Sequence, residues 1–146
     1  LSVGQADYLV VDMDRVLNES QHGQAGLESM QALLRRARSD AEGLKATLLK
    51  ASTPLAQKDA REALLQHRRQ VERELDKRRG ALRNALVKLA TKVARDIAND
   101  RGVELVLERR SAVVFDDNKE VTEQVIERVD ASQFTARPKG AKKAPR

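Results

Sequence analysis

The sequence predicts a mainly α-helical protein in which a long antiparallel helical hairpin, a coiled-coil arm, is joined to a small β-sheet oligomerisation domain built from both chain ends. Charged residues make up 34% of the 146 residues and aromatic residues only 2%. This composition is typical of long packed helices and poor for a compact core. Short β-branched segments occur near both ends of the chain, and apolar residues recur at helical spacing between them.

The first predicted strand is the apolar run Tyr8–Val11, which is bounded by two aspartates and is too short for a helix. Its partners lie far along the chain. Val103–Leu107 and Ala112–Phe115 are two further apolar runs separated by the polar residues 108–111. This pattern predicts a β-hairpin that pairs with the first strand.

Residues 13–101 are predicted to form a helix, a turn and a second helix. The only strong helix breaker within them is the cluster Ser52–Pro54, which predicts a turn near residues 52–55. Before it, apolar residues alternate at spacings of three and four, as a heptad seam does; they are Leu27, Met30, Leu34, Ala37, Ala41, Leu44, Leu48 and Ala51. After it, they recur every eleven residues, which favours a straighter path; they are Ala60, Leu64, Val71, Leu75, Leu82, Leu86, Val93 and Ile97.

The segment after the hairpin has its own signals. Gly102 fits the end of the second long helix. Thr122 fits the N-cap of a short helix over residues 123–129, which would turn Val125, Ile126 and Val129 towards the sheet. No acidic residue follows Asp130, and the remaining residues lack apolar periodicity. We expect this end to be a disordered basic tail.

These elements predict three regions. Residues 1–17 and 102–130 form the β-containing oligomerisation body, residues 18–101 form the hairpin arm, and residues 131–146 form the tail. A sheet this small cannot build a proper core alone, so we expect its apolar residues to meet other copies of the chain. The predicted oligomerisation residues are Leu9, Val11, Leu105, Val106, Leu107 and Val114.

Three stretches of the chain resemble the Skp/OmpH family of periplasmic chaperones. The stretch Val10–Ser20 resembles the opening signature of the family, and Gly23-Gln24-Ala25 fits the residues next to that signature. The stretches 102–115 and 120–126 resemble its closing strands and terminal helix. The resemblance spans about residues 6–130, although the arms look short for the family, residues 108–110 replace its usual turn, and the basic tail is extra.

The resemblance implies a homotrimer whose β body is assembled from three chains, with helical arms that enclose unfolded outer-membrane proteins. It also implies a holdase chaperone of the periplasm, one that prevents aggregation without ATP. The chain begins at Leu1 rather than Met, and we expect a signal peptide to have been removed. No apolar run reaches about 18 residues, so we expect a soluble chain.

We find no pattern of residues that predicts catalysis, and we do not expect an enzyme. Cysteine is absent, and the two histidines, His22 and His67, stand in no nucleophile, metal or carboxylate arrangement. No glycine-rich phosphate loop is present in the sequence. We therefore predict no catalytic, cofactor-binding or metal-binding residues, and no cofactor.

The net charge of +6 favours anionic partners. A basic run on the second helix contains Arg78, Arg79, Arg83 and Lys88, which we predict to contact clients or an anionic lipid surface such as lipopolysaccharide. A solvated helix face explains the same run about equally well. The alternative function is a basic coiled-coil protein that binds nucleic acid or acts as a structural spacer. Nucleic acid is the weaker interpretation because aromatic residues for base stacking are scarce.

Overall fold

The computed structural model describes residues 7–136; residues 1–6 and 137–146 lie outside the described part. The chain divides into two compact units. The first, which we call the mixed unit, comprises residues 7–26 and 82–136, and the second, the hairpin unit, comprises residues 27–81. Leu86 and Ile97, on the second long helix, are fully buried within the mixed unit.

The sheet of the mixed unit joins the two ends of the chain, as predicted. Strand β1 (Tyr8–Val11) pairs in parallel with β2 (Leu105–Glu108), with Tyr8 opposite Leu105. On its other side, β1 forms an isolated bridge to Glu120, and the backbone N–H of Val121 donates to the carbonyl oxygen of Val10 at 2.9 Å. β1 is therefore paired on both edges, and its residues 9–11 are buried.

The predicted strand Ala112–Phe115 is wrong. A 3-10 turn, η1 (Arg109–Ser111), follows β2 directly, and a second, η2 (Asp117–Lys119), follows the loop after it. Val113 and Val114 are 96% and 90% exposed. β-branched residues favour a strand only when a neighbour pairs with them, and within the described residues this segment has no paired strand.

The first helical segment is interrupted, which the sequence patterns did not predict. Helix α1 (Met13–Glu19) is capped by the Asp12 side chain, which accepts from the N–H of Arg15, and it ends at Ser20 in an extended conformation. Helix α2 (Gln21–Lys50) begins immediately afterwards, with the Ser20 hydroxyl accepting from the N–H of Gly23 at 3.0 Å. A side chain at Gly23 would collide with the carbonyl oxygen of Leu17, so this tight junction requires glycine.

The other helix boundaries largely follow the sequence. Helix α3 (Pro54–Asp100) begins after a three-residue turn, with Thr53 Oγ1 accepting from Ala56 N–H at 3.1 Å. The predicted stop is confirmed, because Gly102 has a φ of 66°, in the left-handed region. Helix α4 (Thr122–Ala131) starts one residue earlier than predicted, with Val121 rather than Thr122 at the N-cap.

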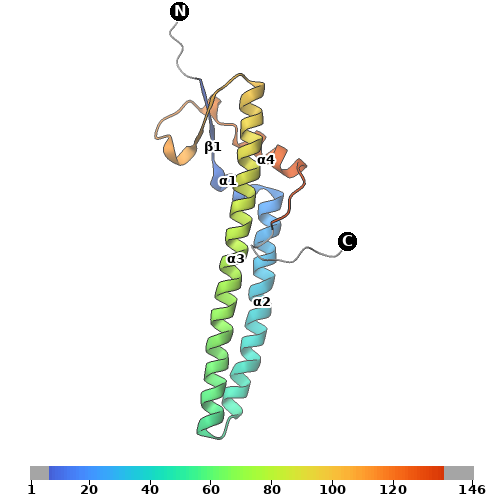
Figure 1. Cartoon of the computed structure of the whole chain (residues 1–146), viewed down its shortest axis with the longest axis vertical. Helices are drawn as coiled ribbons and strands as arrows, with labels where there is room; N and C mark the ends of the chain where they lie inside the picture. Colours follow the sequence, from blue (N-terminus) through green and yellow to red (C-terminus); the bar gives the residue numbers. More distant parts are fainter. Residues whose placement is uncertain (1–6, 137–146) are drawn as a thin grey trace, which may run out of the picture. The chain divides into compact units, whose positions relative to one another are not determined.

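Within the hairpin unit, α2 and α3 run side by side in opposite directions (Figure 1). Met30, Ala37 and Ala60 are buried along their shared seam, as predicted. Leu27 and Leu34, which the heptad also placed on the seam, are instead 42% and 37% exposed. None of the helices in the described range 7–136 has the length and hydropathy of a membrane span.

Residues 131–136, the described part of the predicted tail, make contacts with the rest of the chain. Ala131 is still helical, the Ser132 carbonyl oxygen lies 2.9 Å from His22 Nε2, and the Phe134 ring stacks on His22 at 5.0 Å between centroids. The basic residues of the tail fall in the range 137–146, outside the described residues.

Candidate binding surfaces

The outer edge of β2 is the first surface that can receive a partner. β1 occupies one edge of β2, and no other described strand pairs with the opposite edge. Leu105 is 44% exposed there, while Val106 and Leu107 are half-buried. An open strand edge presents backbone N–H and C=O groups that another chain can pair with.

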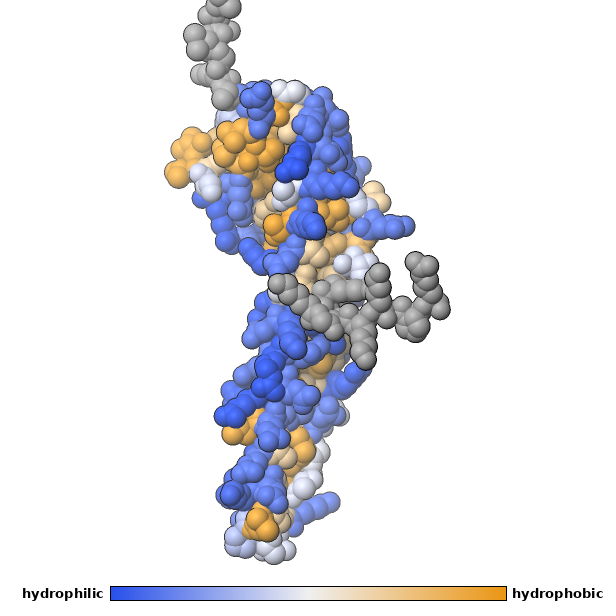
Figure 2. Space-filling model, in the orientation of Figure 1, coloured by the Kyte–Doolittle hydropathy of each residue, from blue (hydrophilic) through white to orange (hydrophobic). Residues whose placement is uncertain are grey.

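A hollow and an apolar loop belong to the same unit. The hollow has a volume of about 620 Å³, and its lining includes Val87 and Ala94 of α3, Val106 and Leu107 of β2, and Val103 between the two elements. The loop between β2 and α4 exposes Val113 and Val114. Figure 2 shows hydrophobic residues gathered over this part of the mixed unit.

Ion pairs hold the exposed loop in place. Arg109 Nη1 lies 3.5 Å from Asp12 Oδ2, and Arg110 pairs with Asp14. At the far end of the loop, Lys119 Nζ lies 2.6 Å from Asp7 Oδ1. The Lys119 ammonium holds the pKa of the Asp7 carboxyl below its ordinary value by hydrogen bonding to it. The two valines are therefore presented by an anchored loop.

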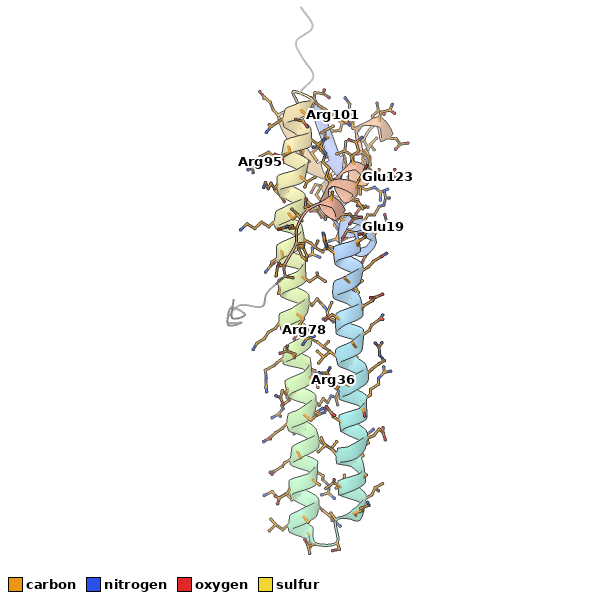
Figure 3. The ribbon with its side chains drawn as sticks, turned by 90° about the vertical axis from the view of Figure 1, so that its right-hand side faces the viewer. Glu19, Arg36, Arg78, Arg95, Arg101 and Glu123 are labelled. Carbon is orange, nitrogen blue, oxygen red and sulfur yellow. The ribbon has the colours of Figure 1, made fainter. Side chains whose placement is uncertain are left out.

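A cation also joins α1 to α4. Arg15 lies 3.0 Å from Glu19, 3.8 Å from Glu120 and 3.8 Å from Glu123; Figure 3 labels Glu19 and Glu123. The hydrogen bond to Glu19 raises the pKa of Arg15. These acids are already paired, so the cluster explains how the two helices are held together.

The predicted oligomerisation residues divide into two groups. Leu105, Val106, Leu107 and Val114 are exposed or half-buried. Leu9 and Val11, in contrast, are 3% and 1% exposed, inside the core of the chain itself. They can support the sheet but cannot meet a partner directly. Val113 was not among the predicted oligomerisation residues. In a strand, successive side chains point to opposite faces, so Val113 and Val114 would not have faced the same partner.

The predicted client-contact or lipid-contact residues are also divided. Arg78 and Arg79 lie in the hairpin unit, and Arg83 and Lys88 lie in the mixed unit, where both are exposed. Arg78 pairs with Glu74 at 3.1 Å and reaches Ser29 on α2 at 3.4 Å, so it is partly engaged in joining the two helices. Arg79 lies 3.6 Å from Asp76 and is more open to solvent.

A groove runs along the hairpin unit. Its volume is about 660 Å³, and its floor is apolar, with Leu34, Leu64, Leu65, Val71 and Leu75 among the lining residues. Charged residues also line it, and they are mostly cations: Arg38, Lys45, Arg61, Arg68 and Glu72. A smaller hollow of about 310 Å³ is lined by Arg36 and Arg78, which Figure 3 labels. The sequence analysis did not predict this groove; Leu65, an apolar residue next to the seam residue Leu64, is the signal that could have indicated it.

The described residues contain no group of three or more His, Cys, Asp or Glu side chains that could hold a metal ion. His67 Nε2 lies 4.0 Å from Asp40 Oδ2 in the hairpin unit, and His22 contacts the segment after α4. In both places the histidine serves a contact between helices or segments. The surfaces described above are suited to binding other molecules through apolar area and charge.

Comparison with known proteins places this arrangement in a family context. The model of the family described as outer membrane protein (OmpH-like) matches residues 7–129. No curated protein matches the sequence. Among solved structures, a candidate OmpH-like outer membrane chaperone from Caulobacter crescentus CB15 is similar, with a TM-score of 0.56 and 12% identity over 93% of this chain and 92% of that chain. At this identity the likeness shows the fold.

Proposed function

This chain belongs to the OmpH-like outer membrane protein family, and from that membership we propose that it is an ATP-independent holdase chaperone, which binds unfolded outer-membrane proteins in the periplasm and prevents their aggregation. The similar Caulobacter structure, described as a chaperone, agrees with this role. The proposal involves no catalysis and no cofactor.

The observation that carries the proposal is the groove of the hairpin unit, which is lined by apolar side chains together with four cations and one acid. A holdase needs many weak contacts rather than one tight site, so that unfolded segments of different sequence can bind and leave. Leu34, Leu64 and Leu65 offer apolar area. Arg38 and Arg61 attract acidic segments at long range without demanding a fixed geometry, whereas Arg68 is already paired with Glu72 at 3.3 Å.

The test is an aggregation assay. An outer-membrane barrel protein is diluted from urea into buffer that contains this protein, and light scattering is followed with and without ATP. We expect scattering to be suppressed near one oligomer per client, equally in both conditions. Unchanged scattering at a several-fold excess, or suppression that requires ATP, would contradict the proposal.

We further propose that the working form is a homotrimer assembled through the mixed unit. The open edge of β2, the hollow beside it and the anchored valines at 113 and 114 supply adjoining apolar area. Large exposed apolar patches on a folded chain mark interaction sites. Static light scattering should give three times the mass of one chain; a monomer at micromolar concentration would contradict the assembly.

The basic residues Arg79, Arg83 and Lys88 are proposed as a guide for acidic clients or for an anionic lipid surface such as lipopolysaccharide. Arg78 contributes less to this role, because its side chain also contacts Ser29 on α2. Exposed cations act through long-range attraction, which salt weakens. Guidance of this kind should therefore act on the rate of capture more than on the lifetime of the complex.

The aromatic rings weigh against nucleic-acid binding as the main function. Lys119 lies over the Tyr8 ring, Arg109 lies 6.0 Å from the Phe115 centroid, and Phe134 stacks on His22. Single-stranded nucleic acid is usually held by free aromatic faces on which bases stack. Titration of duplex and single-stranded DNA beside the client distinguishes the two functions, since a DNA-binding protein would prefer DNA at physiological salt.

A further inference from the structure

A histidine on α3 faces an aspartate on α2 inside the hairpin unit. His67 Nε2 lies 4.0 Å from Asp40 Oδ2, and the two side chains are 20% and 61% exposed. Of the ion pairs within residues 27–81, this one alone joins α2 to α3, because the others are formed within a single helix. The contact carries charge across the seam only when the imidazole is protonated.

His67 stands between the groove and the smaller hollow of the hairpin unit. It lines both of them, and only Ala37 and Val71 share this position with it. A buried charge is costly when water cannot reach it. The His67 ring borders two open hollows and is itself partly exposed, so a protonated ring can stay hydrated here.

Charged groups of both signs from α2 line the two hollows; they are Arg36, Arg38, Asp40 and Lys45. Lys45 is already paired with Glu42 at 3.5 Å. Arg36 and Arg38 are exposed, so water and salt screen their repulsion of a charged imidazole. Asp40 is the α2 group that pairs with the ring.

On α3, most of the charged groups that line the hollows are paired with each other; the groups are Arg61, Arg68, Glu72, Glu74 and Arg78. Arg68 lies 3.3 Å from Glu72, and Arg78 lies 3.1 Å from Glu74. Arg61 is exposed. Among the acids that line the two hollows, Asp40 is therefore the one that no arginine or lysine of the described residues pairs with.

We propose that His67 and Asp40 form a proton-dependent ion pair that joins α2 to α3 and strengthens the hold of the groove on acidic client segments as the pH falls from 7.5 to 5.5. Histidine is the side chain whose charge ordinarily changes between pH 5 and 8. The pair needs the protonated ring, so it stabilises the hairpin at pH 5.5 and is lost at pH 7.5. Protonation also adds a positive charge to the groove, where four cations accompany one acid. The effect on clients rests on the proposed function, whereas the ion pair does not.

A double-mutant cycle at two pH values tests the ion pair. Thermal unfolding of the 146-residue chain, followed by circular dichroism, compares the wild type, His67→Gln, Asp40→Asn and the double variant. At pH 5.5, Asp40→Asn should lower the melting temperature of the wild type by about 3 °C and leave that of His67→Gln unchanged. At pH 7.5 the two changes should act independently. Independence at pH 5.5, or equal coupling at both pH values, would overturn the proposal.

Two matched variants serve as controls, since the sequence contains only two histidines. His22→Gln removes the other histidine, which contacts the segment after α4, and should leave the coupling intact. Asp59→Asn removes an exposed acid of the same unit and should have the same effect with and without His67. Coupling of Asp59 to His67 as large as that of Asp40 would assign the effect to net charge and overturn the ion pair.

The effect on the groove is measured by fluorescence anisotropy. The probe is a histidine-free peptide of leucine and aspartate residues that carries a pH-insensitive dye. The wild type should bind it about threefold more tightly at pH 5.5 than at pH 7.5, and His67→Gln should bind it equally at both. A His67→Gln variant that keeps the pH dependence would overturn the regulation of the groove.

Failure of this proposal and failure of the chaperone function give different results. A wild type that suppresses aggregation, but whose peptide affinity is the same at both pH values, would refute the regulation alone. A wild type that neither binds the peptide nor suppresses aggregation would refute the chaperone function, and the regulation with it. The coupling between His67 and Asp40 in thermal unfolding would stand in both cases.

Discussion

The hydroxyl oxygen of Thr122 accepts a hydrogen bond of 2.9 Å from the backbone N–H of Asp12, although the two residues are 110 positions apart. Thr122 is 1% exposed and also donates to Glu120 at 3.0 Å. At the other end of α4, Asp130 accepts from the N–H of Gln21 at 2.8 Å, the first residue of α2. Helix α4 is thus fastened to both ends of the α1 segment.

We predict that Thr122→Val destabilises the protein. Valine keeps the shape of threonine but leaves the Asp12 N–H without its acceptor, which costs about 1 to 3 kcal/mol when the group is buried. Thr122→Ser keeps the hydroxyl and should be milder. Urea unfolding followed by circular dichroism measures both. A valine variant with the wild-type midpoint would show that this bond is not needed.

Glycine residues at two positions should respond to alanine in opposite ways. A Cβ atom on Gly23 would lie 1.8 Å from the Leu17 carbonyl oxygen, so the backbone must move, and Gly23→Ala should lower the free energy of unfolding by about 2 kcal/mol or more. Nothing lies within 4 Å of a Cβ on Gly80. Gly80→Ala should therefore raise the free energy of unfolding by about 1 kcal/mol, because alanine favours helix.

Thermal or urea unfolding of the two variants checks this contrast. Gly43→Ala is a second control, since its Cβ also meets nothing within 4 Å. A Gly23→Ala variant as stable as the wild type would mean that the α1–α2 junction relaxes without cost.

Local patterns predicted the elements that depend on local physics. The turn before Pro54 and the stop at Gly102 are set by residues close in sequence, and the structure has both. The eleven-residue spacing also marked the buried side of α3, where Leu82, Leu86, Val93 and Ile97 are at most 9% exposed.

The features that the sequence did not reveal depend on distant partners. Threonine is a residue type that favours the N-cap position, but the hydroxyl of Thr122 accepts a hydrogen bond from the backbone N–H of Asp12. The residue types of Ala112–Phe115 favour a strand, but among the described residues no strand pairs with this segment. The candidate binding surfaces follow the same rule: the basic run could be read from the sequence, whereas the exposure of Leu34 and Leu65 in the groove depends on how the two helices meet.

The paired strands β1 and β2 offer a test of the proposed assembly. Leu9 is 3% exposed and Leu105 is 44% exposed. Leu9→Asp should unfold the mixed unit, because an unpaired charge in the core costs several kcal/mol. Leu105→Asp should leave most helicity intact and reduce the oligomer mass. Light scattering and circular dichroism measure the two effects. A Leu105→Asp variant that keeps the wild-type oligomer mass would show that the contact between chains does not involve Leu105.

The basic residues that lie outside the contact between helices should guide clients without stabilising the fold. We expect Arg79→Glu, Arg83→Glu and Lys88→Glu together to slow client capture without loss of helicity, because exposed charges contribute little to stability, about 0 to 1 kcal/mol each. The variant spares Arg78, whose bond to Ser29 joins α2 and α3. The control Arg69→Glu, Arg73→Glu and Lys77→Glu makes the same change in net charge at other positions of α3.

Stopped-flow capture rates at two salt concentrations separate local guidance from a general effect of charge. Screening shortens the reach of a charge from about 10 Å at 0.1 M salt to about 3 Å at 1 M, so the difference between variant and wild type should fade at high salt. Apolar holding should persist there, and client lifetimes should change less than association rates. Equal slowing by the control would assign the effect to net charge alone. Equal capture rates for the wild type, the variant and the control at low salt would show that these cations are ordinary solvated surface. A variant that loses DNA binding but captures clients as the wild type does would favour the nucleic-acid function.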